Sequence, residues 1–262
     1  MRQQNSGTLE SCESRIASEG AISDEKIRYR RRLIGEGVVI VASILLAFAI
    51  DAAWAQRQVR SEEREALAAL ETEFSANLEQ IDQVIDIYLR DRARVATLRQ
   101  ATPEELRTLS QREVSEIMLA TSNIWSFDPV LGATDALISS GRLGVLRDPR
   151  LREALSTFTN LVADAAEDVP ALRSFVEEIW RFEGQHGGPW SDPETEVSWA
   201  GPIEGFSFLP RATPDDLIRV REDPLLMSLV ARLHLNAAYY VGDLQRLRSE
   251  IANVLDLVGA ES

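Results

Sequence analysis

The fold is decided by residues 67–98, LAALETEFSANLEQIDQVIDIYLRDRARVATL. Apolar side chains recur there at spacings of three, four or seven residues, which places them on one face of a helix. These residues are Leu67, Leu70, Phe74, Leu78, Ile81, Ile85, Tyr88, Val95 and Leu98. No glycine or proline occurs from Val38 to Thr102, so we expect one long helix. We interpret its charged residues as a solvated face: Glu71, Glu73, Glu79, Asp82 and Asp86.

A second apolar stripe lies near the end of the chain. Its members alternate by four and three residues, which is typical of helices that pack with a left-handed twist. They are Leu226, Val230, Leu233, Ala237, Tyr240, Leu244, Leu247, Ile251 and Val254. Because the two stripes are similar in length, we predict antiparallel packing, with Val254 near Leu67 and Leu226 near Leu98. A helix from a second chain could also use either stripe, as in a coiled coil.

Helix starts between the stripes are marked by capping residues. Three hydroxyl residues, Thr102, Ser110 and Thr213, are each followed three residues later by an acid, as in a capping box. Asp148 and Asp223 each precede a proline, which suits the first turn of a helix. Helices are therefore expected at 103–109, 111–122, 131–140, 149–168, 171–184, 214–221 and 224–258. Pro170 should separate the fourth from the fifth, and Gly141 and Gly144 should end the third.

The stretch 183–212 is rich in glycine and proline and is expected to be an irregular loop. Loops of this length in compact domains commonly have a function. Its aromatic residues, Trp190, Trp199, Phe206 and Phe208, argue against disorder. A short hairpin is expected around residues 196–199 and 206–209.

An uncharged apolar run, Gly37–Ile50, follows the basic cluster Lys26–Arg32. Fourteen helical residues reach only about 21 Å, less than the roughly 30 Å of a bilayer core. Extension to residues 33–55 gives enough length and places Glu36 and Asp51 near the ends, where charge costs less. We therefore predict a transmembrane helix at 33–55. A signal peptide cleaved after Ala55 is the alternative reading.

Charge predicts how the chain is placed. Residues 1–32, a disordered and then basic tail, should be cytoplasmic because basic residues flank the anchor on that side. Residues 56–262 then form an extracytoplasmic domain at the plasma (inner) membrane. The net charge of −14 arises after residue 55, because residues 1–55 hold seven basic and seven acidic side chains. An acidic domain repels nucleic acid, so DNA and RNA are not predicted as partners. The lipid bilayer is a predicted partner because of the transmembrane helix.

No catalytic or cofactor-binding constellation stands out. Cys12 is the only cysteine, and His186 and His234 are not spaced as zinc ligands, so neither a metal nor another cofactor is predicted. His186 lies near Glu183, Asp192 and Glu194 in sequence and could act with a carboxylate, although a plain loop residue is the favoured reading. Arg142, between Gly141 and Gly144, is read as a helix end or, alternatively, a binding turn. The candidate binding residues are His186, Trp190, Trp199, Phe206, Phe208 and Arg142.

Two sequence blocks resemble a group of bacterial single-pass membrane proteins. The first is Leu33–Glu36 with the apolar run and its exit through Arg57–Arg60. The second joins Phe127–Pro129, Asp135–Leu143 and Leu151–Leu155. Asp51 departs from the group's pattern. The resemblance implies a retained anchor and a helical domain, and it implies no activity.

The fold predicted from these features is all-α, a transmembrane helix continuing into an elongated antiparallel bundle. The leading functional hypothesis is a non-enzymatic interaction or scaffold protein, which uses its long helices for a protein partner or for self-association. The alternatives are an extracytoplasmic small-ligand sensor that works through a partner chain, and a secreted enzyme with His186 in its site.

Overall fold

The structure is a computed structural model that describes residues 7–188, 197–199, 206–208 and 212–261, with side chains from 41 to 188 and from 212 to 261. The chain divides into two compact units, residues 1–62 and residues 63–262. The first consists of the beginning of α1 (Gly7–Gln100). The helix begins at Gly7, whereas the sequence predicts a disordered tail there. Residues 8–34 contain no proline and a single glycine, so nothing in this stretch forces a helix to end.

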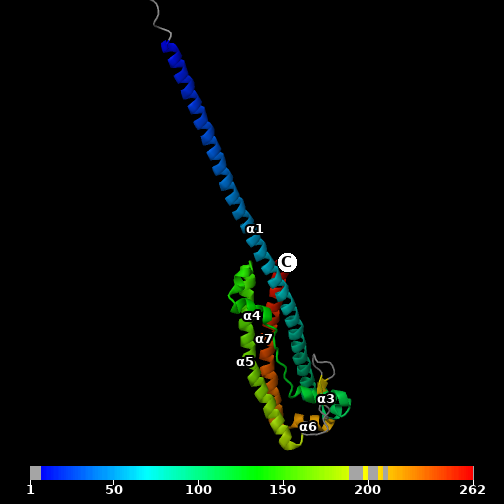
Figure 1. The fold of residues 1–262 in the computed structure, drawn as a ribbon. Coiled ribbons are helices and arrows are strands. Elements are labelled where there is room, and N and C mark those ends of the chain that lie inside the picture. Colours follow the sequence, from blue (N-terminus) through cyan, green and yellow to red (C-terminus); the bar gives the residue numbers. More distant parts are fainter. Residues whose placement is uncertain (1–6, 189–196, 200–205, 209–211, 262) are drawn as a thin grey trace, which may run out of the picture. The chain divides into compact units, whose positions relative to one another are not determined.

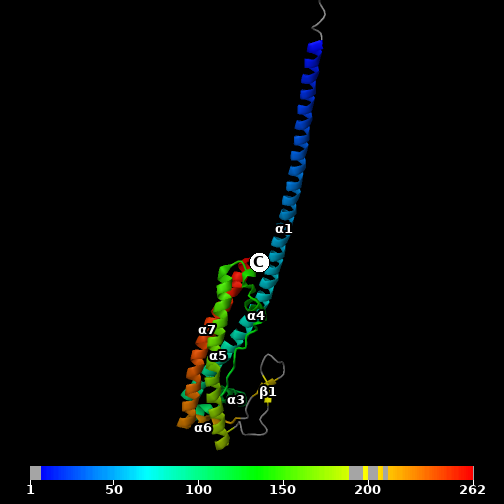
Figure 2. The same ribbon diagram turned by 60° about the vertical axis from the view of Figure 1, so that its left-hand side comes forward.

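Three long helices form the second unit. Residues 63–100 of α1 pack with α5 (Pro149–His186) and α7 (Pro224–Glu261), as Figures 1 and 2 show. Both predicted apolar stripes are in the core: Leu78 is partly buried, and the other members are buried. The all-helical bundle predicted from these stripes is confirmed.

α1 and α7 are antiparallel, as predicted. Asp82 forms an ion pair with Arg248, and the Tyr88 ring meets the Tyr240 ring edge-on with centroids 5.7 Å apart. The expected pairs, Val254 near Leu67 and Leu226 near Leu98, would put Tyr240 opposite residue 81 or 84, so the register is displaced by roughly one to two turns of helix. A seven-residue repeat keeps the same stripes in contact when one helix slides by seven residues, so the pattern fixes orientation more firmly than register.

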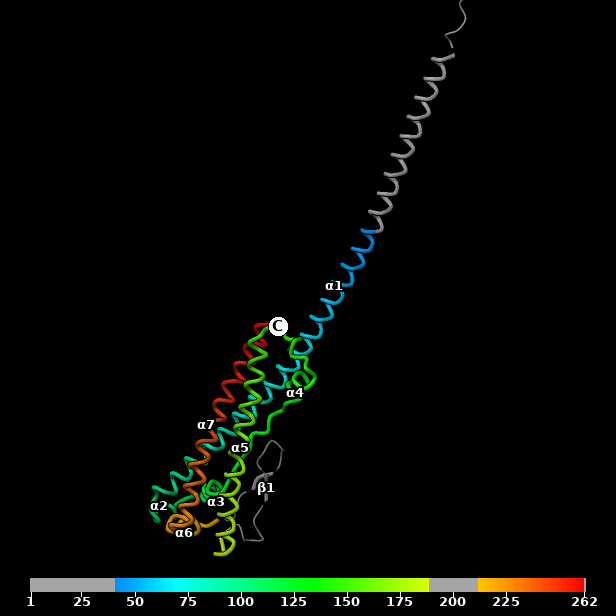
Figure 3. The backbone as a smooth tube through the Cα atoms, turned by 90° about the vertical axis from the view of Figure 1, so that its left-hand side faces the viewer, coloured from blue at the N-terminus to red at the C-terminus, as the bar shows by residue number. Residues whose placement is uncertain are grey.

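Short elements close the two ends of the bundle. At one end lie α2 (Pro103–Leu106), α3 (Gln111–Ala120) and α6 (Pro214–Glu222) (Figure 3). At the other, where α7 ends, lie α4 (Gly132–Ser139) and the 3-10 helix η1 (Arg142–Val145). All three predicted capping boxes form, and the carboxylates of Asp148 and Asp223 accept from backbone N–H groups as expected. Gly141 follows α4 with a left-handed φ of 68°, which glycine adopts without strain.

Pro170 does not separate two helices, because α5 continues through it. A proline inside a helix costs about 3 kcal/mol. Leu172, Val176 and Ile179 follow it and are buried in the core. Burying a side chain of this size contributes roughly 1.5–3 kcal/mol each, which outweighs the cost. The prediction of separate helices at 149–168 and 171–184 is therefore wrong.

The irregular stretch contains a short hairpin, as predicted. Strands β1 (Val197–Trp199) and β2 (Phe206–Phe208) are antiparallel, with Val197 opposite Phe208 and Trp199 opposite Phe206. The backbone between and around the strands lies outside the described residues, and so do Glu196 and Leu209.

Candidate functional site

The predicted loop site is described only at its base. His186 is the last residue of α5, exposed, with its ring stacked on Phe182 at 4.2 Å and its Nδ1 2.7 Å from the Phe182 carbonyl oxygen. The ring therefore bonds to its own helix. Asp192 and Glu194 lie outside the described residues. A histidine–carboxylate pair is absent from the part of the site that the structure describes.

Glu183, one turn before His186, is the unusual group at this end of α5. It is 1% exposed, and among the described residues neither of its carboxylate oxygens has a hydrogen-bond partner. Burial raises its pKa to about 7, although the charge of Arg219 lowers it and that of Asp216 raises it further. Gly188 lies directly against this carboxyl, since a Cβ there would be 2.8 Å from the Glu183 Cβ.

The end of α5 is held by its neighbour α6. Gly187 adopts a left-handed φ of 71°, and the Gly188 N–H donates to the Glu183 carbonyl at 2.8 Å, closing the helix. Arg219 of α6 donates to the carbonyls of His186 and Gly187 at 3.2 and 3.4 Å. The loop that follows α5 therefore begins at a fixed position.

The other predicted site residues do not join His186. Arg142 belongs to η1, before the start of α5, whereas His186 ends that helix. A helix of this length spans about 57 Å at 1.5 Å per residue. Trp190 lies outside the described residues, as do the side chains of Trp199, Phe206 and Phe208. Arg142 and His186 therefore lie near opposite ends of α5, and ligand binding at either residue stays a prediction.

Sequence reasoning missed a row of buried polar side chains on α1. These side chains bind the connecting segment 122–131 and the start of α4. Asn77 pairs with both backbone groups of Val130 at 2.7 and 2.8 Å. The Tyr88 hydroxyl accepts from the Trp125 N–H at 3.1 Å and donates to the Trp125 carbonyl at 2.9 Å. On α7, the Tyr240 hydroxyl accepts from the Phe127 N–H at 2.9 Å.

Glu73 corrects the prediction of a wholly solvated charged face. It is 5% exposed, and its carboxylate accepts from the N–H groups of Ala133 and Thr134 at 2.5 and 3.1 Å. The Thr134 hydroxyl donates to it at 2.6 Å. α4 begins at Gly132 without a side-chain cap of its own, so α1 supplies the cap. Asp82, also predicted to be solvated, is half-buried and binds Arg248.

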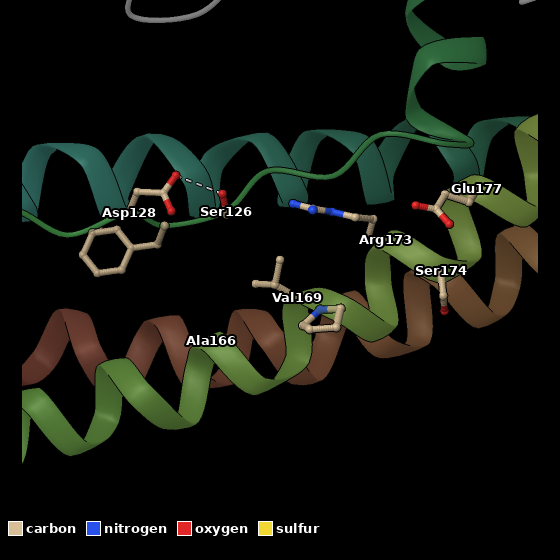
Figure 4. Close-up of a pocket in the computed structure, with 9 residues that line it drawn as sticks. Ser126, Asp128, Ala166, Val169, Arg173, Ser174 and Glu177 are labelled. Atoms are coloured by element: carbon tan, nitrogen blue, oxygen red, sulfur yellow. Dashed lines mark hydrogen bonds between the residues drawn. The ribbon is translucent and has the colours of Figure 1, made fainter.

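A shallow groove of about 390 Å³ lies between residues 126–128 and the middle of α5. Figure 4 shows Arg173 between Asp128 and Glu177 along it. None of these three forms an ion pair with another described residue. The Ser126 hydroxyl donates to Asp128 at 3.0 Å. Of the predicted loop residues, His186 is the one whose side chain is described, and it does not line this groove.

The apolar run has described side chains from residue 41 to residue 50, and its large side chains are exposed. Leu45, Leu46 and Phe48 are 62%, 63% and 66% exposed, and Trp54, just after the run, is 70% exposed. The side chains of the basic cluster and of residues 37–40 lie outside the described residues. Within the described part of the chain, no helical stretch has both the length and the apolarity to span a membrane.

Among the described residues, no three acidic, histidine or cysteine side chains gather as a metal ion would require. Comparison of this chain with protein-family models, curated proteins and solved structures finds no match. Function must therefore be argued from the residues themselves.

Proposed function

We propose that this chain is a membrane-anchored interaction protein, held by one helix at residues 33–55, with its helical bundle outside the cytoplasm. The observation that carries this proposal is the exposure of apolar side chains around α1. Ile44, Leu45 and Leu46 are consecutive and more than half exposed, and neighbours in a helix point about 100° apart. Apolar side chains on all sides of a helix favour an apolar surrounding.

The energy of insertion supports this placement. The run Gly37–Ile50 contains nine residues of the Val, Ile, Leu and Phe types. Each contributes about −0.3 to −0.6 kcal/mol at the centre of a bilayer, about −3 to −5 kcal/mol together. Glu36 and Asp51 each cost up to about 3 kcal/mol at the centre and much less near the ends, where both fall here. Insertion is favourable on this balance.

The surface of the bundle supports an interaction role. Both apolar stripes are buried in the protein's own core, so a partner would have to bind to other residues. α7 carries Leu225, Leu235 and Tyr239, which are 57%, 56% and 66% exposed. Leu235 and Tyr239 are four residues apart and so lie on one helical face. We propose this face as the partner surface.

Alkaline carbonate extraction of cell membranes tests the anchor. The full chain should stay with the membrane, and Leu45→Arg should release it, whereas Glu65→Arg, outside the anchor, should not. A reporter that folds only outside the cytoplasm, fused after residue 262, should be active. Complete release of the wild-type chain by carbonate would refute the anchor. Activity of a second kind of reporter, one that works only in the cytoplasm, fused at the same place would refute the orientation.

Affinity purification from detergent-solubilised membranes tests the partner surface. The paired change Leu235→Glu and Tyr239→Glu should remove a protein that copurifies with the wild type. Glu71→Gln, on the exposed surface of α1, is the matched control and should retain it. Equal recovery by the paired variant would refute the proposed surface.

A further inference from the structure

The groove beside Pro170 combines charged and apolar groups as a small polar ligand requires. One wall is formed by residues 126–128 and the other by α5 residues between 166 and 177 (Figure 4). Its volume of about 390 Å³ falls within the roughly 300–1,000 Å³ of known small-molecule sites. The groove is independent of the partner face proposed on α7.

Charge in the groove alternates along its length. Arg173 provides a guanidinium between the carboxylates of Asp128 and Glu177 (Figure 4). Within the described residues Arg173 forms no ion pair, so its fork of N–H donors is available. A guanidinium binds a carboxylate in a planar, two-bonded geometry, and a carboxylate binds an ammonium group. The groove can therefore hold both ends of a zwitterion.

Proline adds an acceptor to the same wall. Pro170 has no backbone N–H, so the carbonyl of Ala166, four residues earlier, lacks its usual helical partner. Ala166 lines the groove. A ligand N–H could bond to this oxygen from within the groove, on the wall opposite Asp128.

The remaining lining is apolar. Phe127 is 8% exposed, and its backbone N–H is fixed by the Tyr240 hydroxyl. Val169 and Pro170 face it from α5. An aliphatic or aromatic group of modest size would displace water from this surface.

We propose that this groove binds a free α-amino acid with an apolar side chain. Its carboxylate bonds to Arg173, and its ammonium group bonds to Asp128 and to the Ala166 carbonyl. Its side chain lies against Phe127 and Val169. Because the groove is shallow, binding is weak and specific to the two charged ends.

Calorimetric titration of the full-length chain in detergent tests this site. Leucine and phenylalanine are the probes, with their N-acetyl derivatives, which lack the ammonium group, and their amides, which lack the carboxylate. Saturable binding of the free amino acids, with each derivative about tenfold or more weaker, is expected. No saturable binding of any free amino acid up to about 10 mM would overturn the proposal.

Variants locate the binding on the molecule. Arg173→Gln should remove the preference for the free acid over the amide, and Asp128→Asn should remove the preference over the N-acetyl derivative. Arg181→Gln changes an exposed arginine of the same helix outside the groove and should bind as the wild type does. Wild-type binding by a folded Arg173→Gln protein, with an unchanged melting temperature, would overturn the site.

Discussion

Glu183 should make the bundle less stable as pH rises toward neutrality. Its carboxyl is buried and has no hydrogen-bond partner in the part of the chain that the structure describes, and its pKa is raised from 4.5 to about 7. The folded protein therefore keeps a proton there at pH values where the unfolded chain has lost it. The stabilisation is fully present below about pH 4.5 and is lost as pH rises through about 7.

The size of the effect follows from the shift. The rise of this pKa from 4.5 to about 7, at about 1.4 kcal/mol for each pH unit, gives about 3.5 kcal/mol between the two limits. Arg219 and Asp216 are the charged groups that act on Glu183 from α6, with opposite signs. Because desolvation is the largest cause, Glu183→Gln, which is neutral at every pH, should remove most of the dependence.

Urea unfolding of the wild type and of Glu183→Gln at pH 5 and pH 8 measures this. The free energy of unfolding of the wild type should fall by about 2–3 kcal/mol more than that of the variant over this range. Glu178→Gln replaces an exposed carboxyl of the same helix and should behave as the wild type. Parallel loss of stability in the wild type and Glu183→Gln would show that Glu183 is already ionised in the fold, and the reasoning would fail.

Three further substitutions test the buried polar contacts and the proline. Glu73→Ala removes the cap of α4 and should lower the free energy of unfolding by about 1–3 kcal/mol in urea titrations, whereas Glu71→Ala should leave it nearly unchanged. Tyr88→Phe leaves the Trp125 N–H and carbonyl without the hydroxyl and should cost about 1–3 kcal/mol; no change in the urea midpoint would mean that water replaces it. Pro170→Ala restores a helical N–H to α5 and should raise the melting temperature by stabilising the bundle about 1–2 kcal/mol, and a lower melting temperature would contradict this.

Local patterns predicted the elements of this fold well. Each capping box joins residues three apart, so its whole signal lies within one turn and is readable in the sequence. The two stripes similarly report which face of each helix is buried. The continuation of α5 through Pro170 was not predictable from that residue, because the packing of distant Leu172, Val176 and Ile179 decides it.

The candidate sites were harder to predict. The predicted loop offered aromatic and histidine residues close together in sequence, and that signal did not reveal the groove. Asp128 and Arg173 come from separate segments, and only the path of residues 122–131 along the bundle brings them to one place (Figure 4). Glu183 was noticed as a neighbour of His186, whereas its burial depends on the arrangement of the end of α5.

The polar residues of α1 explain why one wall of the groove is fixed. Asn77 and Tyr88 are buried, and each bonds to the backbone of residues more than thirty positions away. In the sequence, Asn77 looks like an ordinary polar residue and Tyr88 like an ordinary member of the apolar stripe, because no residue nearby indicates the hydrogen-bond partner. Such contacts leave no buried N–H or carbonyl of Trp125 and Val130 unpaired, and an unpaired one would cost about 1–3 kcal/mol. A wall held in this way loses little entropy when a ligand binds, so even a shallow groove can discriminate between the charged ends of a small molecule.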